Sequence, residues 1–357
     1  MKKKLTIALI TGFVSLISGL ILVGIGFFSG GLNRLEEIAK PNQVQTSYTS
    51  LSEIQIKDLP HSVTIKESTD GLFHVSYANS KNNTHNTVEV TEKNGILALS
   101  SKNPQLSIQG IMQFLGERLA DDAIDIYSVT IEVPTGKQLD RLISNNAYNR
   151  YYDSLYIENV HIKEMTVEQG GTLYLNNVQL DSGTLSSYYT TDISKSTIKN
   201  TTISAQGDNI LFYQTQLENV SVENYGQLDL IEGTLLGDNK FLPHEDRAYT
   251  VTNIDLTDQS LADINLQIQN KLDLRSLGEF MGYYYESDEE WETAQSESSL
   301  IDESQLKDIG IFTRDQYEKL EVKETEDGFS LTVEKKESKN KLSLDATNAT
   351  INFRDPK

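Results

Sequence analysis

Two carboxylates are the residues best suited, by type and spacing, to carry out chemistry. Asp181 and Glu218 occupy the same position of a repeat of about 18 residues, two repeats apart. Between stacked β-strands that separation is about 10 Å, close to the roughly 6.5–9.5 Å between the acid and base of an inverting glycosidase. One interpretation is therefore a glycan hydrolase, and the other is a pair of unrelated surface acids.

Other catalytic and metal-binding patterns are absent from the sequence. It contains no G-x-S-x-G, H-E-x-x-H or G-x-x-x-x-G-K-[ST] motif. Cysteine is absent, which excludes disulfides, thiolate nucleophiles and cysteine metal sites. No two of the five histidines have the spacing of a metal pair on a helix. We therefore expect a protein without a cofactor or a metal, and one that is not an enzyme.

Tyrosine is the more informative surplus, with 17 residues against 11 phenylalanines. Tyr156 and Tyr174 occupy the same position in adjacent repeats and are predicted to stack. Asn159 and Asn177 share another position, which predicts a short ladder of side-chain amides. The tyrosines are candidates for binding a sugar or a protein partner, and the alternative is that they only cover a strand surface.

The first thirty residues indicate a membrane protein. Three lysines precede an uncharged stretch, residues 5–28, which is long enough to span a bilayer. The positive-inside rule places residues 1–4 in the cytoplasm and the rest of the chain outside. We therefore expect a single-pass protein of the cell membrane. The alternative is a signal peptide that is cleaved near residues 29–31.

Small residues recur along one face of the predicted membrane helix. Gly12, Gly19, Gly26 and Gly30 fall on this face, and the last two form a G-x-x-x-G pair. Such stripes allow helix backbones to approach closely in lipid. The prediction is a packing face for a membrane-protein partner or a second copy, and the alternative is that glycine is simply common in membrane helices.

The part outside the membrane reads as all-β. Residues 29–50 are expected to be a linker, and residues 51–135 a run of β-hairpins, because apolar residues alternate between tight-turn signals such as Asp70-Gly71 and Asn94-Gly95. One amphipathic helix is predicted at residues 111–120. Residues 323–357 are expected to contribute further strands, which together with the hairpins cap the central region.

Residues 136–275 carry the repeat, and it predicts a β-solenoid. Each unit has apolar residues at its first, sixth and eleventh positions, and a unit of this length is too short for a helical hairpin but suits one coil of stacked strands. The first positions are Ile157, Leu175, Ile193, Phe212 and Leu230, at spacings of 18, 18, 19 and 18 residues. Val251 is expected to begin a further unit after a longer gap.

Residues 276–322 interrupt the pattern with a strongly acidic insertion. It holds the only tryptophan, Trp291, beside a cluster of aspartates and glutamates. One interpretation is a partner-binding or cation-binding arm, and the other is a solvated acidic loop. The whole chain has a net charge of −21, which makes nucleic acid an unsuitable partner because phosphates require clustered lysine and arginine.

Several segments resemble a known family. They are VTIK (residues 63–66), TVEVTEKNGILALS (87–100), TIEVPTG (130–136), and the repeats LYIENVHIKEMTVEQGG and LYLNNVQLDSGTL. They are similar to the putative-adhesin, β-strand-repeat family of Gram-positive bacteria, which includes envelope-stress proteins of the LiaG and LiaX kind. The resemblance implies a β-repeat fold at the cell envelope and brings no catalytic residues.

Two functional hypotheses follow. The first is a non-enzymatic, membrane-anchored envelope protein that acts as a binding scaffold or stress-response module, with a membrane-protein partner at the helix or a wall glycan at the solenoid. The second is a glycan-active enzyme on wall or capsule polysaccharide, for which Asp181 and Glu218 are the candidates. A surface adhesin differs from the first hypothesis only in where its partner resides.

Overall fold

The computed structural model describes residues 2–30, 40–81, 86–103, 114, 116, 127–146, 154–207, 209–243, 250–257, 259–260, 263–271, 317–325, 328–335, 337–347 and 349–353. The chain divides into two units. The first comprises residues 1–44, 77–88 and 102–127, and the second comprises residues 45–76, 89–101 and 128–357. Each unit is described by itself.

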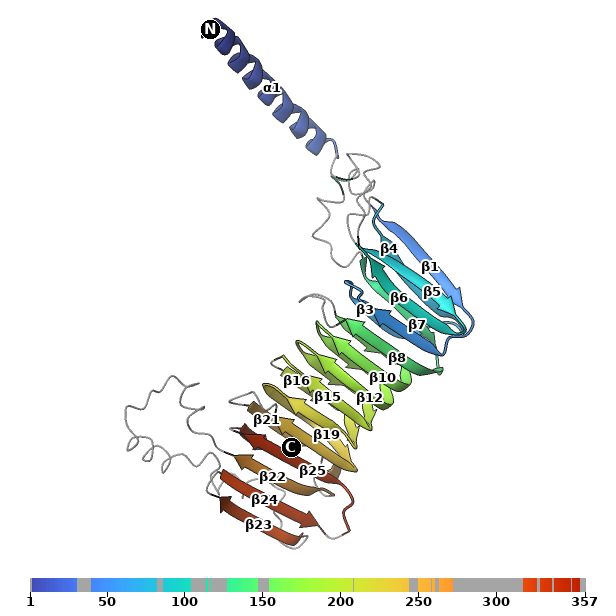
Figure 1. The fold of residues 1–357 in the computed structure, drawn as a ribbon, viewed down its shortest axis with the longest axis vertical. Helices are drawn as coiled ribbons and strands as arrows, with labels where there is room; N and C mark the ends of the chain where they lie inside the picture. The colour runs from blue at the N-terminus through green and yellow to red at the C-terminus, as the bar shows by residue number, and fades with distance from the viewer. Residues whose placement is uncertain are drawn as a thin grey trace, which may run out of the picture. The chain divides into compact units, whose positions relative to one another are not determined.

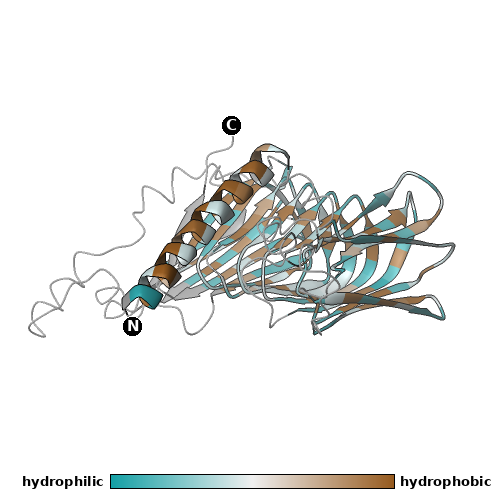
Figure 2. Ribbon diagram, turned by 90° about the horizontal axis from the view of Figure 1, so that it is seen from above, coloured by the Kyte–Doolittle hydropathy of each residue, from teal (hydrophilic) through white to brown (hydrophobic). Residues whose placement is uncertain are grey.

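Helix α1 (Lys2–Phe28) is the main element of the first unit. Its 24-residue stretch Lys3–Gly26 has a mean hydropathy of 2.4 and is long and apolar enough to cross a membrane. Figure 2 shows the helix as mostly hydrophobic beyond a hydrophilic first turn, where the lysines lie. The expected apolar N-terminal helix is therefore present.

The rest of the described chain is almost entirely strand, so the all-β expectation is confirmed at this level. The strands are β1 (Asn42–Tyr48), β2 (Glu53–Lys57), β3 (Val63–Ser68), β4 (Phe73–Asn79), β5 (Thr87–Lys93), β6 (Ile96–Lys102), β7 (Val129–Pro134), β8 (Gln138–Asn146), β9 (Leu155–Glu158), β10 (His161–Gln169), β11 (Leu173–Asn176), β12 (Gln179–Ser187), β13 (Thr191–Ser194), β14 (Thr197–Lys199), β15 (Thr201–Ala205), β16 (Asn209–Tyr213), β17 (Gln216–Glu218), β18 (Ser221–Asn224), β19 (Gln227–Leu236), β20 (Asp238–Pro243), β21 (Thr250–Leu256), β22 (Asn265–Lys271), β23 (Tyr317–Thr325), β24 (Gly328–Lys335), β25 (Lys341–Thr347) and β26 (Ala349–Phe353).

Parallel pairing joins each repeat to the next along two ladders. In the first ladder Leu175 of β11 faces Ile157 of β9 on one side and Ile193 of β13 on the other. In the second ladder β10 pairs with both β8 and β12, and Figure 1 shows these three strands side by side. Each strand therefore completes its backbone hydrogen bonds with the preceding and following repeats.

The register stacks like residues into buried columns. Apolar and polar residues alternate along the strands, and Figure 2 shows this alternation as hydrophobic and hydrophilic bands. Apolar residues at alternate positions point inward because successive side chains of a strand face opposite ways. The columns at the first and sixth repeat positions are at most 1% exposed and consist of Ile157, Leu175, Ile193, Phe212, Leu230, Ile162, Leu180, Ile198, Leu217 and Leu235.

A left-handed residue forms the corner after each first-ladder strand. These residues share one repeat position and have φ between 50° and 56°. A residue other than glycine pays roughly 1–2 kcal/mol in this region, and asparagine tolerates it best. The corner residues are Asn159, Asn177, Lys195, Gln214 and Glu232.

The expectation of successive hairpins in residues 51–135 is wrong for β2 and β3. Strand β2 pairs in parallel with β6 and β8, and β3 pairs in parallel with β7 and β9. Both edges of each strand are therefore occupied, which leaves none free for a hairpin partner. The ladders consequently extend to the N-terminal side of residue 136, the expected first residue of the repeat region.

Individual turns and boundaries also differ from expectation. Asn94 and Gly95 have φ of 56° and 79°, which confirms the tight turn there. Ile254, and not Val251, takes the place of Leu230 in the following strand, because residues 244–249 lengthen that connection and shift the register. Strand β23 begins inside the segment expected to be the acidic insertion. The predicted helix at 111–120 lies outside the described residues apart from Phe114 and Gly116.

Candidate functional site

Asp181 and Glu218 do not form an open carboxylate pair. The Oδ2 of Asp181 accepts a hydrogen bond from Gln138 Nε2 at 3.0 Å and lies 3.2 Å from His161 Nε2. Glu218 forms an ion pair with Lys199, with Nζ and Oε2 3.2 Å apart. Lys199 lies on β14, which pairs with β12 and β17 and so separates the two carboxylates. This arrangement offers no observation in favour of glycoside hydrolysis.

The predicted tyrosine stack is present. The rings of Tyr156 and Tyr174 are parallel, with centroids 4.7 Å apart. Burial raises the pKa of Tyr174, and the neighbouring Tyr156 and Asp192 raise it further. Because each ring covers a face of the other, a sugar ring cannot stack between them. The pair mainly closes the strand surface, and its role in binding stays a prediction.

The candidates at the predicted helix face have different positions in the structure. A Cβ added at Gly12, Gly19 or Gly26 would meet no atom within 4 Å. Gly30 lies beyond the end of α1 with a φ of +80°, so its placement on the helical face is wrong. A left-handed glycine just past a helix commonly terminates it. Trp291 lies outside the described residues.

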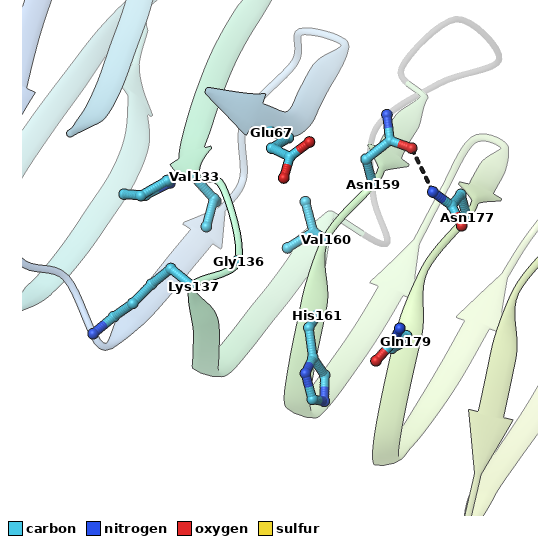
Figure 3. Close-up of a pocket in the computed structure, with 10 residues that line it drawn as sticks. Glu67, Val133, Gly136, Lys137, Asn159, Val160, His161, Asn177 and Gln179 are labelled. Carbon is cyan, nitrogen blue, oxygen red and sulfur yellow. Dashed lines mark hydrogen bonds between the residues drawn. The ribbon is translucent and has the colours of Figure 1, made fainter. Parts of the chain in front are cut away.

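A groove lies at the corner where β7 leads into β8. Its volume is about 290 Å³. Figure 3 shows its lining around the corners of three successive repeats. The lining residues are Glu67, Val133, Pro134, Gly136, Lys137, Asn159, Val160, His161, Asn177 and Gln179. Polar side chains therefore surround a small apolar wall.

Gly136 is the residue that leaves this groove open. It lies in a tight turn closed by the Lys137 N–H, which donates to the Pro134 carbonyl at 2.9 Å, and its φ is +71°. Gln138 pairs with His161, so Gly136 stands where the next repeat has Asn159. The corner column therefore starts with a residue that has no side chain.

The asparagine ladder stops at the groove. Asn177 Nδ2 donates to Asn159 Oδ1 at 2.7 Å, as the shared repeat position predicts. Within the described part of the chain, the Nδ2 of Asn159 has no partner of its own. Figure 3 shows that this nitrogen does not face Asn177. The end of the ladder thus presents an unused donor.

Glu67 supplies a matching acceptor. It lies near the end of β3, opposite Val133 of β7, and is half-buried. None of the other described residues forms an ion pair or hydrogen bond with its carboxylate. In Figure 3 its carboxylate lies among Val133, Asn159 and Val160, whereas the ammonium group of Lys137 points away from them. The groove therefore combines an acceptor with a donor.

A second polar constellation joins Ser47, His74 and Asp70. Ser47 Oγ is 2.8 Å from His74 Nδ1, and His74 Nε2 is 2.9 Å from Asp70 Oδ1. The imidazole is turned the opposite way from a serine-protease triad, where the carboxylate holds Nδ1. We interpret the chain of bonds as a tether between β1 and β4, which are paired. No sequence motif marks it, because the residues are 27 positions apart at its ends.

Comparisons with known proteins give distant likenesses only. No protein-family model matches the chain, and no curated protein matches it. It is similar to a putative adhesin from Bacteroides fragilis, at 13% identity over 60% of this chain and 89% of that one, with a TM-score of 0.31. It is also similar to a putative adhesin from Parabacteroides merdae, at 11% identity over 61% and 89%, with a TM-score of 0.33.

A third likeness is to a putative cell adhesion protein from Clostridium sporogenes. The identity is 10%, the match covers 88% of this chain and 99% of that one, and the TM-score is 0.20. TM-scores of this size carry no argument about function. The function proposed below is therefore argued from the residues of this chain.

Proposed function

We propose that this chain is a non-enzymatic, membrane-anchored envelope protein of the putative-adhesin, LiaG- and LiaX-like kind. Its stacked repeats would form a β-solenoid outside the cell and bind a glycan or a protein partner there. The observation that carries the proposal is the pair of parallel ladders, whose apolar columns lie inside and whose polar side chains lie outside. Such a stack provides a rigid, water-facing surface on which a binding site can be built.

Two further features support the proposal. The apolar helix α1 follows a run of lysines, as in an anchor whose N-terminus stays in the cytoplasm. The carboxylates most suited to acid–base catalysis are each engaged, Asp181 with Gln138 and His161, and Glu218 with Lys199. Binding is therefore favoured over hydrolysis.

Sedimentation with wall material tests this function. The full chain is reconstituted into liposomes and mixed with purified cell-wall sacculi, and liposomes without protein serve as the control. We expect the protein-bearing liposomes to sediment with the sacculi and to release no reducing sugar. Absence of co-sedimentation would contradict wall binding. Release of reducing ends that Asp181→Asn abolishes would favour the enzyme.

A further inference from the structure

We propose that the groove beside Gly136 binds one neutral sugar residue of a surface glycan, held between the Glu67 carboxylate and the Asn159 side-chain amide. The inference rests on the proposed function, because it names the ligand class and the place where the surface would bind it. Its argument has three parts: the hydrogen-bonding groups in the groove, the size of the groove, and the glycine that keeps it open.

The hydrogen-bonding groups match those of adjacent hydroxyls. An ionised carboxylate only accepts hydrogen bonds, and an amide NH₂ group only donates them. A sugar hydroxyl does both, so one hydroxyl can donate to Glu67 while its neighbour accepts from Asn159 Nδ2. An anionic ligand would be repelled by Glu67, whose carboxylate has no cation paired to it among the described residues. A purely apolar ligand would leave both groups unsatisfied.

The size and the wall of the groove favour a single sugar ring. The groove volume of about 290 Å³ lies at the lower end of the roughly 300–1,000 Å³ typical of small-molecule sites. Val133, Pro134 and Val160 supply an apolar wall. A pyranose ring has an apolar face of C–H groups that can pack against such a wall while its hydroxyls remain at the polar side. A longer oligosaccharide would have to extend out of the groove.

Gly136 provides a direct way to close the site. An added Cβ at this position meets no atom within 4 Å, and asparagine tolerates the left-handed φ of +71°. In Gly136→Asn the new side chain would stand in register with Asn159 and Asn177. It would extend the amide ladder by one member and occupy both the groove and the free Nδ2 of Asn159. The variant therefore blocks the site by continuing a structure that the chain already has.

The experiment measures binding of the methyl glycosides of glucose, galactose, mannose and N-acetylglucosamine to the full chain in detergent. Saturation-transfer NMR detects binding, and titration gives the dissociation constant. We expect at least one glycoside to bind saturably. Gly136→Asn and Glu67→Gln should each weaken it at least tenfold. Glu158→Gln, on the outer face of β9 and away from the groove lining, should leave it unchanged.

Unfolding midpoints keep the test independent of stability. If Gly136→Asn lowers the midpoint, Glu67→Gln still removes the acceptor without any change of backbone. The proposal is overturned if no glycoside binds, or if a bound glycoside is unaffected by both groove variants. Failure of the proposed function is distinguishable, because glycoside binding with no sedimentation on sacculi would overturn wall binding and leave the sugar site intact.

Discussion

Asn177 donates its side-chain amide to Asn159 across one repeat at 2.7 Å, and both residues have left-handed backbones, with φ of 54° and 56°. The residue type thus meets two requirements at once. Asparagine tolerates the corner conformation, and its amide can both donate and accept along the stack. The same ladder ends at Gly136, where the groove begins. A structural motif and the candidate binding site therefore share one column of residues.

Two substitutions of Asn177 separate these requirements. Asn177→Gly keeps the left-handed backbone and loses only the amide bond, so it should cost about 0.5–1.5 kcal/mol of unfolding free energy. Asn177→Ala also places a Cβ in the left-handed region, which adds roughly 1–2 kcal/mol. Urea unfolding of the full chain in detergent, followed by fluorescence, measures both. Equal destabilisation by the two variants would contradict this account of the corner.

The tether at Asp70 predicts a pH-dependent contribution to stability. The backbone N–H of Leu72 and the side chain of His74 both bond to Asp70 and lower its pKa from the usual 3.8. A carboxyl whose pKa is lowered on folding stabilises the fold above its unfolded pKa, and this stability is lost as the pH falls through the lowered value.

We therefore expect Asp70→Ala to be less stable than the natural chain at pH 7, and the difference to shrink as the pH falls below about 4. Asp70→Asn retains an acceptor for the Leu72 N–H and should lose less. Thermal unfolding midpoints between pH 3 and pH 7 test this. A difference that stays constant over the whole range would be inconsistent with the ionised carboxylate as its source.

Lys335 predicts a stabilising substitution. Its side chain is 7% exposed, and burial lowers its pKa below 10.5 while Asp263 partly opposes this shift. The folded protein therefore binds the proton more weakly than the unfolded chain, and its stability should rise as the pH increases from the lowered pKa towards 10.5.

Lys335→Met should raise the unfolding midpoint at pH 7 and remove that rise at alkaline pH. Lys339→Met is the matched control, because Lys339 is exposed two residues beyond the end of β24 in the same C-terminal region only four positions away. Unfolding scans at pH 7 and pH 10 compare the three proteins. A midpoint lowered by Lys335→Met would mean that the contacts of the ammonium group outweigh its burial.

The helix glycines predict a partner within the membrane. Replacing Gly19 and Gly26 together by leucine fills the expected contact face, which should abolish close helix packing in lipid. Cross-linking of the full chain in membranes, followed by extraction in mild detergent, measures what is captured. A partner or dimer captured equally by both chains would show that these glycines do not form the contact.

The sequence pattern anticipates the central ladders well and the N-terminal pairing poorly. Ile157, Leu175 and Ile193 recur at the same 18-residue spacing that separates them in the ladder, so local periodicity carries their register. Strand β3 lies between β7 and β9, some 60 to 90 residues away in sequence. No repeat period marks such pairing, and alternation alone fits a hairpin equally well.

The groove is harder to predict because its central residue contributes by lacking a side chain. Gly136 is equivalent to Asn159 at an offset of 23 residues, not 18. That longer connection hides the equivalence from a repeat search. The signal in the sequence is a glycine after Pro134-Thr135, which predicts a turn and does not predict a site. Only the register of β8 with β10 brings Glu67 and Asn159 to one corner.

The topology of the chain in intact cells tests the central claim most directly. The protein has no cysteine, so single-cysteine variants of the full chain report cleanly on exposure to a membrane-impermeant maleimide. Tyr188, which is 57% exposed, and Lys3 are replaced separately. We expect Tyr188→Cys to be labelled on intact cells and Lys3→Cys only after permeabilisation, both in the membrane fraction. Protection of Tyr188→Cys until the cells are opened would contradict a surface-binding protein anchored by α1.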